Sequence, residues 1–230
     1  MYIYGKNVVK EAIYAKRDIY ELFLDEKFND YKYEEFLKEN NLKFKKTNKG
    51  ELNNLTNNGV HQGIVAKIKP YEYKTLKEVI KKDVRQRFLI LDGINDPHNF
   101  GAIIRTAEAT KLDGIIVPRR NQVGLTNVVA KVSSGAIEHV NIIEVNNINQ
   151  VINELKENNI WIVGTDGLAE NNYDEIDKSL SIAIIVGNEG HGIRPLVKRN
   201  CDILVKIPMY GKVNSLNVSV AAALMLYATI

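Results

Sequence analysis

Hydrophobic and polar positions alternate over short distances in the first part of this chain. From Val8 to Ile13 the apolar residues are spaced as on one face of a helix, directly after Gly5. Further strand patterns lie at 21–24, 42–45 and 63–68, and further helical patterns lie at 33–40 and 50–55. Short strands and helices mixed in this way predict a small α+β domain over residues 1–69.

The pattern changes at Phe88, where strands begin to alternate regularly with helices. Strand patterns lie at 88–91, 114–117, 140–144, 160–164, 182–186 and 203–207, and helical patterns at 100–110, 127–134, 148–157, 195–200 and 215–230. Several of these strands are continuous apolar runs, which is typical of a parallel sheet covered by helices on both faces. The pattern therefore predicts an α/β domain over residues 88–230, with residues 70–87 as a linker that contains a short helix at 76–80.

Charge divides the chain at the same place. Residues 1–87 carry 19 Lys and Arg against 13 Asp and Glu, whereas residues 88–230 carry 12 against 15. The basic residues cluster at 43–49 and again at 81–87. Such clusters suit a phosphate backbone, but charge alone slightly favours the plainer interpretation, solvated faces of a lysine-rich chain.

The last eighteen residues, Val213–Ile230, contain no charged side chain and approach the length of a membrane span. Polar residues such as Asn214 and Asn217 interrupt the run, so we expect a buried or subunit-facing helix and no membrane partner. The start of the chain lacks the pattern of a signal peptide. The single cysteine, Cys201, fits a reducing compartment. We therefore expect a cytoplasmic protein.

Three separated stretches place glycine and polar residues directly after an apolar run. These stretches are Leu91–Gly101 continuing into Ile104–Glu108, Val186–Gly192, and Ile207–Gly211 together with Asn214–Asn217. Ligands of α/β sheets bind where the strands end, and glycine there lets backbone N–H groups approach a bound group closely. Three such ends predict one composite site.

Spacing excludes several familiar chemistries at this site. The glycines from Gly187 to Gly192 read G-x-x-G-x-G, which is not the dinucleotide fingerprint, and no P-loop is present. The four histidines lack metal-ligand spacing, so no metal is expected. No G-x-S-x-G sequence supplies a nucleophile for acyl transfer. Arg105 and Glu108 share a helix face, where a surface ion pair is the plain interpretation, but the apolar residues around them favour a functional Arg105.

The three stretches resemble the signature motifs of the SpoU family, within the SPOUT superfamily of RNA ribose 2′-O-methyltransferases that use S-adenosylmethionine. Their order, spacing and residue types agree across residues 88–230. The first domain, with Tyr4-Gly-Lys-Asn7 and His61-Gln-Gly-Ile-Val-Ala66, resembles the substrate-binding domain of the 23S ribosomal RNA guanosine methyltransferases of this family. That domain is similar to ribosomal-protein RNA binders of the L30e type.

The resemblance implies a deep trefoil knot in the C-terminal domain, a homodimer formed through the C-terminal helix, and RNA as partner. It implies S-adenosylmethionine-binding residues and catalytic residues. The first set is Thr165, Gly167, Gly187, Ile207, Met209 and Leu216; the second is Asn99, Arg105, Glu189, Ser215 and Asn217. Ser215 and Asn217 are also residues of the kind that caps a helix.

The implied reaction is methyl transfer from S-adenosylmethionine to a ribose 2′-hydroxyl, of a guanosine in 23S ribosomal RNA. Arginine rarely gives up its proton, so we expect Arg105 to stabilise the developing alkoxide as a cation, with a phosphate or solvent as base. A tRNA ribose methyltransferase is the alternative within the family, and a non-catalytic RNA-binding protein of the same fold is the alternative outside enzymes. A Rossmann-type oxidoreductase is disfavoured by the glycine spacing.

Overall fold

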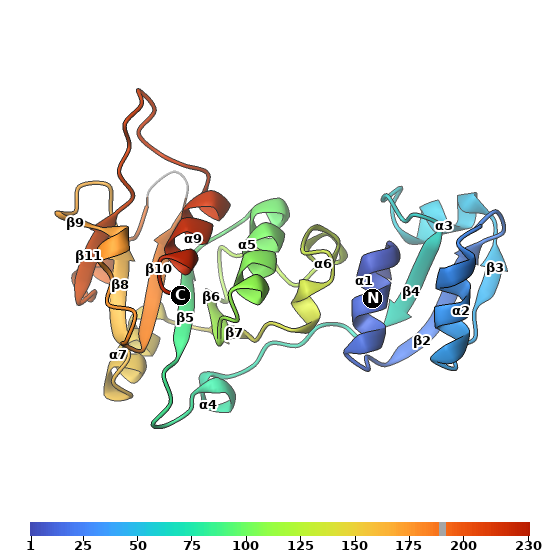
Figure 1. The fold of residues 1–230 in the computed structure, drawn as a ribbon, viewed down its shortest axis with the longest axis horizontal. Helices are drawn as coiled ribbons and strands as arrows, with labels where there is room; N and C mark the ends of the chain where they lie inside the picture. Colours follow the sequence, from blue (N-terminus) through green and yellow to red (C-terminus); the bar gives the residue numbers. More distant parts are fainter. Residues whose placement is uncertain (189–191) are drawn as a thin grey trace. The chain divides into compact units, whose positions relative to one another are not determined.

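The computed structural model describes residues 1–188 and 192–230, which divide into two compact units (Figure 1). Unit 1 comprises Met1–Glu72 and Leu125–His139, and unit 2 comprises Tyr73–Gly124 and Val140–Ile230. This division differs from the expected one in two respects. The segment 125–139, expected within the C-terminal domain, packs with the N-terminal residues, and most of the expected linker belongs to unit 2.

Unit 1 is built on a mixed sheet with the strand order β1-β4-β2-β3. Strands β1 and β2 pair antiparallel with β4, and β3 runs parallel to β2. The elements of unit 1 are β1 (Tyr2–Tyr4), α1 (Lys6–Tyr14), β2 (Ile19–Asp25), α2 (Tyr31–Glu39), β3 (Lys45–Thr47), α3 (Lys49–Leu55), β4 (Ile64–Ile68), α6 (Asn127–Val132) and the 3-10 helix η1 (Ala136–Glu138). The unit is therefore α+β, as the sequence predicts.

Long-range contacts hold the segment 125–139 to the rest of unit 1. The Tyr71 hydroxyl donates to Glu138 at 2.7 Å, and His139 Nε2 lies 2.9 Å from Glu11 Oε2. Gly135 has φ +91°, and a Cβ built there would lie 2.7 Å from the Cβ of Glu11. Glycine is thus required for α1 and η1 to approach this closely, and no local pattern reveals that contact.

Unit 2 is built on a parallel sheet with the order β7-β6-β5-β10-β8-β11-β9. Its elements are α4 (Leu76–Val79), β5 (Arg87–Asp92), α5 (Pro97–Ala109), β6 (Gly114–Pro118), β7 (Ile142–Val145), α7 (Ile148–Glu157), β8 (Trp161–Thr165), β9 (Asn171–Asn172), the 3-10 helix η2 (Tyr173–Glu175), β10 (Ile182–Gly187), α8 (Pro195–Arg199), β11 (Ile203–Lys206) and α9 (Val218–Tyr227). The predicted α/β class is confirmed.

Helices cover both faces of this sheet. Alternate residues of the central strands, such as Phe88 and Ile90 of β5 and Ile185 of β10, share one apolar cluster with residues of α4, α7 and α8. Helices α5 and α9 pack against each other, and α9 also contacts β10. Figure 1 shows α5 and α9 side by side in front of the strands. Because both faces are covered, all six residues of β5 and all six of β10 are buried.

Three expected elements differ by three residues at one end or at both ends from those observed. Helix α9 spans Val218–Tyr227 and not 215–230, because the side chain of Asn217 accepts from Ser219 N at 2.9 Å and caps the helix there. Strand β3 covers Lys45–Thr47, later than the expected 42–45. Helix α5 begins at Pro97, since Pro suits the first turn of a helix and Asp96 caps it. Among the described residues, no helix has the length and hydrophobicity to cross a membrane.

Candidate active site

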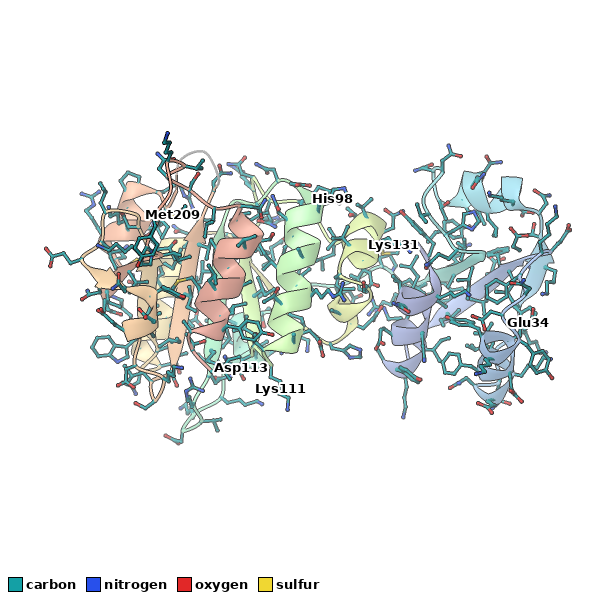
Figure 2. The ribbon with its side chains drawn as sticks, turned by 45° about the horizontal axis from the view of Figure 1, so that its top comes forward. Glu34, His98, Lys111, Asp113, Lys131 and Met209 are labelled. Carbon is teal, nitrogen blue, oxygen red and sulfur yellow. The ribbon has the colours of Figure 1, made fainter. Side chains whose placement is uncertain are left out.

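A cavity of about 580 Å³ opens at the carboxyl ends of β8, β10 and β11. Its walls come from the loop after β8, the end of β10, the loop after β11, the residues before α9, and the first turn of α9. This volume lies within the range of small-molecule and cofactor pockets. Figure 2 labels Met209 of the loop after β11 and His98 at the start of α5, both at this end of unit 2.

All six residues expected to bind a cofactor line this single cavity. They come from four places in the chain, namely Thr165 at the end of β8 with Gly167 after it, Gly187 at the end of β10, Ile207 and Met209 after β11, and Leu216 before α9. The structure therefore brings the predicted set together. Their role in binding stays a prediction.

Gly187 is required by the close packing at the end of β10. A Cβ at this position would lie 2.0 Å from the carbonyl carbon of Gly192 and 2.3 Å from Ile193 N. Backbone hydrogen bonds join Asn188 and Gly192 in both directions, at 3.1 Å and 2.8 Å. Since backbone cannot move aside as a flexible side chain can, even an alanine would displace this wall of the cavity.

The loop after β8 is held by several polar contacts. The Thr165 hydroxyl donates to Ile185 O at 3.0 Å, and Asp166 N donates to Val205 O at 2.9 Å. The Asp166 carboxylate accepts from Leu168 N and pairs with Lys198, and its hydrogen bond with Lys198 lowers the pKa of the carboxyl. Gly167 faces open space, with no heavy atom within 4 Å of a built Cβ. A bound ligand can therefore approach its backbone.

Two of the expected catalytic residues meet directly. Asn99 lies in the first turn of α5 and is 9 % exposed, and Asn217 caps α9. The Asn217 amide Nδ2 donates to Asn99 Oδ1 at 3.0 Å, while Asn217 Oδ1 accepts from Ser219 Oγ at 2.6 Å. This chain of contacts joins the first and third sequence stretches and sets the orientation of both amides.

The remaining expected catalytic residues are placed less closely together. Ser215 is exposed and lines the cavity, but it does not cap α9. Arg105 lies six residues beyond Asn99, about 9 Å along the helix axis. Its side chain is exposed, lies outside the cavity lining, and forms no ion pair with Glu108 or with any other residue the structure describes. Glu189 lies outside the described residues.

Other residues contribute to the site without having been singled out from the sequence. Asn188 lines the cavity, and its Nδ2 donates to Gly93 O at 2.8 Å, which ties the end of β10 to the loop after β5. Asp166 anchors the loop after β8. Asn188 follows the predicted Gly187, and Asp166 lies between the predicted Thr165 and Gly167. This position beside predicted residues is the sequence signal that could have identified them.

Of the two charged residues that line the cavity, Asp166 pairs with Lys198, whereas Lys206 forms no ion pair with the described residues. A further charged pair lies nearby at the end of β5. Asp92 at the end of β5 is 6 % exposed and accepts from Arg194 Nε at 2.8 Å and from Arg194 N at 3.0 Å. In the described part of the chain, no group of three or more His, Cys, Asp or Glu side chains is placed to hold a metal ion. The cavity is thus lined mainly by backbone, amide and apolar groups.

Comparison with known families identifies the chain. The SpoU rRNA Methylase family matches residues 86–227. The chain belongs to this family. The RNA 2′-O ribose methyltransferase substrate-binding family matches residues 2–74, so the expected family is found in both parts of the chain. The protein is accordingly an RNA methyltransferase of the SpoU/TrmH family.

Individual relatives agree with the family assignment. A Staphylococcus aureus (strain MSSA476) protein described as a TrmH family tRNA/rRNA methyltransferase is 44 % identical over 234 aligned positions, covering 98 % of this SpoU chain and 93 % of the relative. An rRNA methyltransferase from Sinorhizobium meliloti, solved with AdoMet (S-adenosylmethionine) bound, has a TM-score of 0.83 at 23 % identity, covering 99 % and 85 % of the two chains. A TrmH/SpoU tRNA modifying enzyme from A. aeolicus has a TM-score of 0.57 at 31 % identity, covering 67 % and 78 %.

Proposed function

We propose that this protein transfers the methyl group of AdoMet to the 2′-hydroxyl of a guanosine ribose in 23S ribosomal RNA. The observation that carries the proposal is the convergence of all six expected cofactor residues on one cavity. The Asn99–Asn217 contact joins two of the three sequence stretches within the same unit.

The cavity has the chemistry that AdoMet requires. Gly167 leaves open space before its backbone, Ile207 and Leu216 supply apolar surface, and the hydroxyl of Thr165 is already bonded to β10. Bound there, AdoMet supplies an electrophilic methyl group on a sulfonium. A wall of glycine, amide and apolar groups suits the neutral thioether that remains after transfer.

The ribose hydroxyl must lose its proton during transfer, and Arg105 is the expected residue to assist. An arginine has a pKa above about 12 and so stays cationic. Because no described carboxylate pairs with Arg105, its charge is available to RNA. We assign to it the stabilisation of the developing alkoxide and of a neighbouring phosphate, with that phosphate or solvent taking the proton. The Asn99–Asn217 pair would position the ribose.

The extent of two solved relatives supports ribosomal RNA over tRNA in this proposal. The rRNA methyltransferase from S. meliloti covers 99 % of this chain, unit 1 included, whereas the tRNA modifying enzyme from A. aeolicus covers 67 % of it. The substrate-binding match at residues 2–74 accounts for much of the remainder. A folded substrate-binding module is thus the feature that points to ribosomal RNA.

Two further features belong to this proposal. A trefoil knot is expected from the family resemblance, and β11 enters the sheet between β8 and β9 although it follows both in sequence. A homodimer through the C-terminal helix is supported by the composition of α9. Its residues Val220 and Tyr227 are 47 % and 57 % exposed, and Ile230 just beyond it is 56 % exposed. Apolar side chains on the outer face of an uncharged helix suit contact with a second copy.

Ribose-methylation mapping of total RNA from cells with and without the gene tests the substrate. Loss of one methylated guanosine in 23S ribosomal RNA is the expected result. Loss of a site in tRNA instead would replace the ribosomal substrate with tRNA, and an unchanged map would overturn the proposed activity.

A further inference from the structure

We propose that a pocket in unit 1 binds a single unpaired nucleotide of the RNA substrate, with its base on Phe28 and its backbone phosphates beside Lys27 and Lys49. The inference rests on the proposed function only in taking RNA as the substrate. It adds a defined binding site to a unit whose family match establishes substrate binding in general terms.

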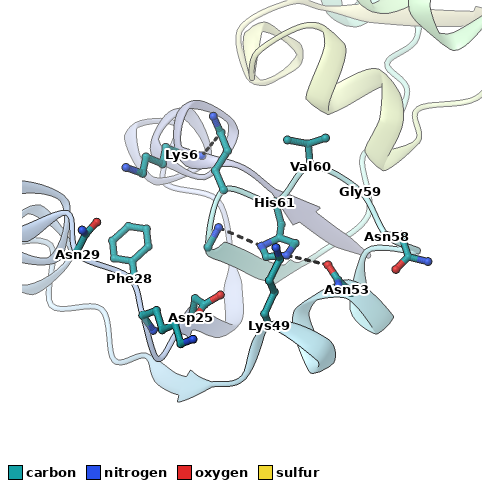
Figure 3. A pocket seen from close by; sticks show the side chains of 13 residues that line it. Lys6, Asp25, Phe28, Asn29, Lys49, Asn53, Asn58, Gly59, Val60 and His61 are labelled. Carbon is teal, nitrogen blue, oxygen red and sulfur yellow. Dashed lines mark hydrogen bonds between the residues drawn. The ribbon is translucent and has the colours of Figure 1, made fainter.

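The pocket has a volume of about 680 Å³, enough for one nucleotide, and it is formed by four segments of unit 1 (Figure 3). They are the start of α1 at Lys6, the loop after β2 from Asp25 to Asn29, the face of α3 with Lys49 and Asn53, and the loop before β4 from Asn58 to Gly63. Asn58, Gln62 and Gly63 all have positive φ, so the last loop is sharply turned.

Phe28 gives the pocket an aromatic wall. Its ring is half-buried and packs edge-on against Tyr33, with centroids 6.0 Å apart. Lys6 Nζ lies over one face of the ring, 5.1 Å from its centroid, so a base would stack on the other face. A Cβ at Gly63 would lie 2.7 Å from the Phe28 ring, and Gly63 has φ +79°. Glycine there both permits the turn and leaves room for the ring. Aromatic rings on which unstacked bases lie are the common means of binding single-stranded RNA.

Two of the three lysines in the pocket carry charge that no described carboxylate neutralises. Lys6 pairs with Asp30 at 2.7 Å, and elsewhere in unit 1 Lys45 and Lys67 pair with Glu21. Lys27 and Lys49 have no such partner among the described residues, and both are exposed. Unpaired lysines in the same pocket as an aromatic wall suit the phosphates that flank a base.

Amide and carboxylate groups inside the pocket can contact the edge of a base. His61 is buried, its Nδ1 accepts from Gly63 N at 3.0 Å, and its Nε2 lies 3.0 Å from Asn53 Oδ1. Because Nδ1 accepts this hydrogen bond, the proton of the neutral ring is on Nε2. Burial lowers the pKa of His61, which favours the neutral ring. Asn53 thereby uses its oxygen and retains Nδ2 as a donor, while Asp25 supplies an acceptor.

The test is fluorescence anisotropy of the full chain with a single-stranded RNA of about twelve nucleotides, and with the same strand annealed into a duplex. Loss of base stacking costs about 1–3 kcal/mol, so Phe28→Leu should weaken single-strand binding by about tenfold. Phe28→Tyr should restore binding. Tyr20→Leu, which removes a 60 % exposed aromatic residue outside the pocket, is the matched control and should bind as the wild type does.

Three results would overturn the proposal. These are single-strand binding too weak to measure in the wild type, equal effects of Phe28→Leu and Tyr20→Leu, and a duplex that binds as tightly as the single strand with the same dependence on Phe28. Amide hydrogen exchange of the residues of unit 1 shows whether Phe28→Leu is folded there, and calorimetry with AdoMet shows that unit 2 is intact. Phe28-dependent RNA binding without any methyl transfer would leave this inference standing and would remove the proposed function.

Discussion

The cavity of unit 2 and the pocket of unit 1 are similar in volume, about 580 Å³ and 680 Å³, but opposite in chemistry. The cavity is lined largely by glycine, amide and apolar residues, and its Asp166 is paired with Lys198. The pocket contains three lysines around Phe28. A nearly neutral wall suits a compact cofactor, whereas a cationic wall with an aromatic ring suits RNA. This difference agrees with the proposal that unit 2 holds the cofactor and unit 1 holds RNA.

The two sites also differ in how they are built. The cavity lies where parallel strands end, and backbone contacts such as Asn188–Gly192 define it. The pocket lies among loops, and its wall from Asn58 to Gly63 includes three residues with positive φ. The ends of the strands give part of the cavity a more rigid wall than a turn gives the pocket. We therefore expect the cavity to tolerate substitution less well than the pocket.

The largest expected effect follows from Gly187→Ala. The added Cβ would overlap the backbone of Gly192, which cannot move aside as a side chain can, so we expect a cost at or above the upper end of the roughly 1–3 kcal/mol typical of overpacking. Calorimetry should show AdoMet affinity reduced by about 100-fold or more, with RNA binding by unit 1 unchanged. Gly124→Ala is the control, because its Cβ meets only the Tyr73 hydroxyl at an ordinary 3.8 Å. Equal AdoMet affinity in both variants would contradict the role of Gly187.

Substitution of Arg105 should lower the rate of methyl transfer without changing the affinity for AdoMet. Removing one positioned group that stabilises developing charge lowers the rate by about 100- to 1,000-fold, so we expect that loss in Arg105→Ala with AdoMet affinity unchanged. Arg105→Lys should retain most of the rate if charge is what matters. Single-turnover methylation assays measure the rate of each variant, and calorimetry measures its AdoMet affinity. Near-total loss in the lysine variant would instead favour the geometry or deprotonation of the guanidinium.

The charge of the pocket is tested by the double substitution Lys27→Gln with Lys49→Gln. Each phosphate contact in single-stranded RNA contributes about 0.7 to the slope of log affinity against log salt. The double variant should lower that slope by about 1.4 and leave AdoMet affinity unchanged. Lys38→Gln with Lys43→Gln removes two exposed lysines of unit 1 that lie outside the pocket. An equal change of slope in both double variants would show that RNA binding depends on the overall positive charge of unit 1 and not on this pocket.

The smallest expected effect concerns the cap of α9. Asn217→Ala removes the cap and the contact with Asn99, and should lower the free energy of unfolding by about 1 kcal/mol. Asn147→Ala removes the equivalent cap of α7, where Asn147 accepts from Asn149 N at 2.9 Å, and should destabilise similarly. Urea unfolding measures both. Only Asn217→Ala should also slow methyl transfer; equal rates would reduce Asn217 to a structural cap.

Elements with a strong local pattern were predictable from the sequence. Helix α7 lies at Ile148–Glu157 as predicted, because its apolar face is regular and Asn147 caps it. Strands β1 and β9 were missed because only distant partners make them strands: Tyr2 pairs with Lys67, and Asn171 pairs with Val205. For the same reason no local pattern assigns the segment 125–139 to unit 1.

The candidate site was likewise predictable from the sequence only in part. The six cavity residues were expected from the resemblance of the motifs, and the structure gathers them. The overlap that Gly187 avoids is visible only when Gly192 is placed beside it. The position of Arg105, exposed and outside the cavity lining, is likewise a three-dimensional fact. The pocket around Phe28 combines four separated segments, and the turn-forming run from Asn57 to Gly63 was its only local signal.

Transfer of a labelled methyl group in vitro tests the proposed ribose methylation of 23S ribosomal RNA most directly. The purified protein is incubated with methyl-labelled AdoMet and with 23S ribosomal RNA from cells that lack the gene, and the RNA is then digested to nucleosides. We expect the label to be recovered as 2′-O-methylguanosine, and the Gly187→Ala variant to give far less of it at the same AdoMet concentration. Label on a base, label on tRNA alone in a parallel incubation, or no label from the wild-type protein would contradict it.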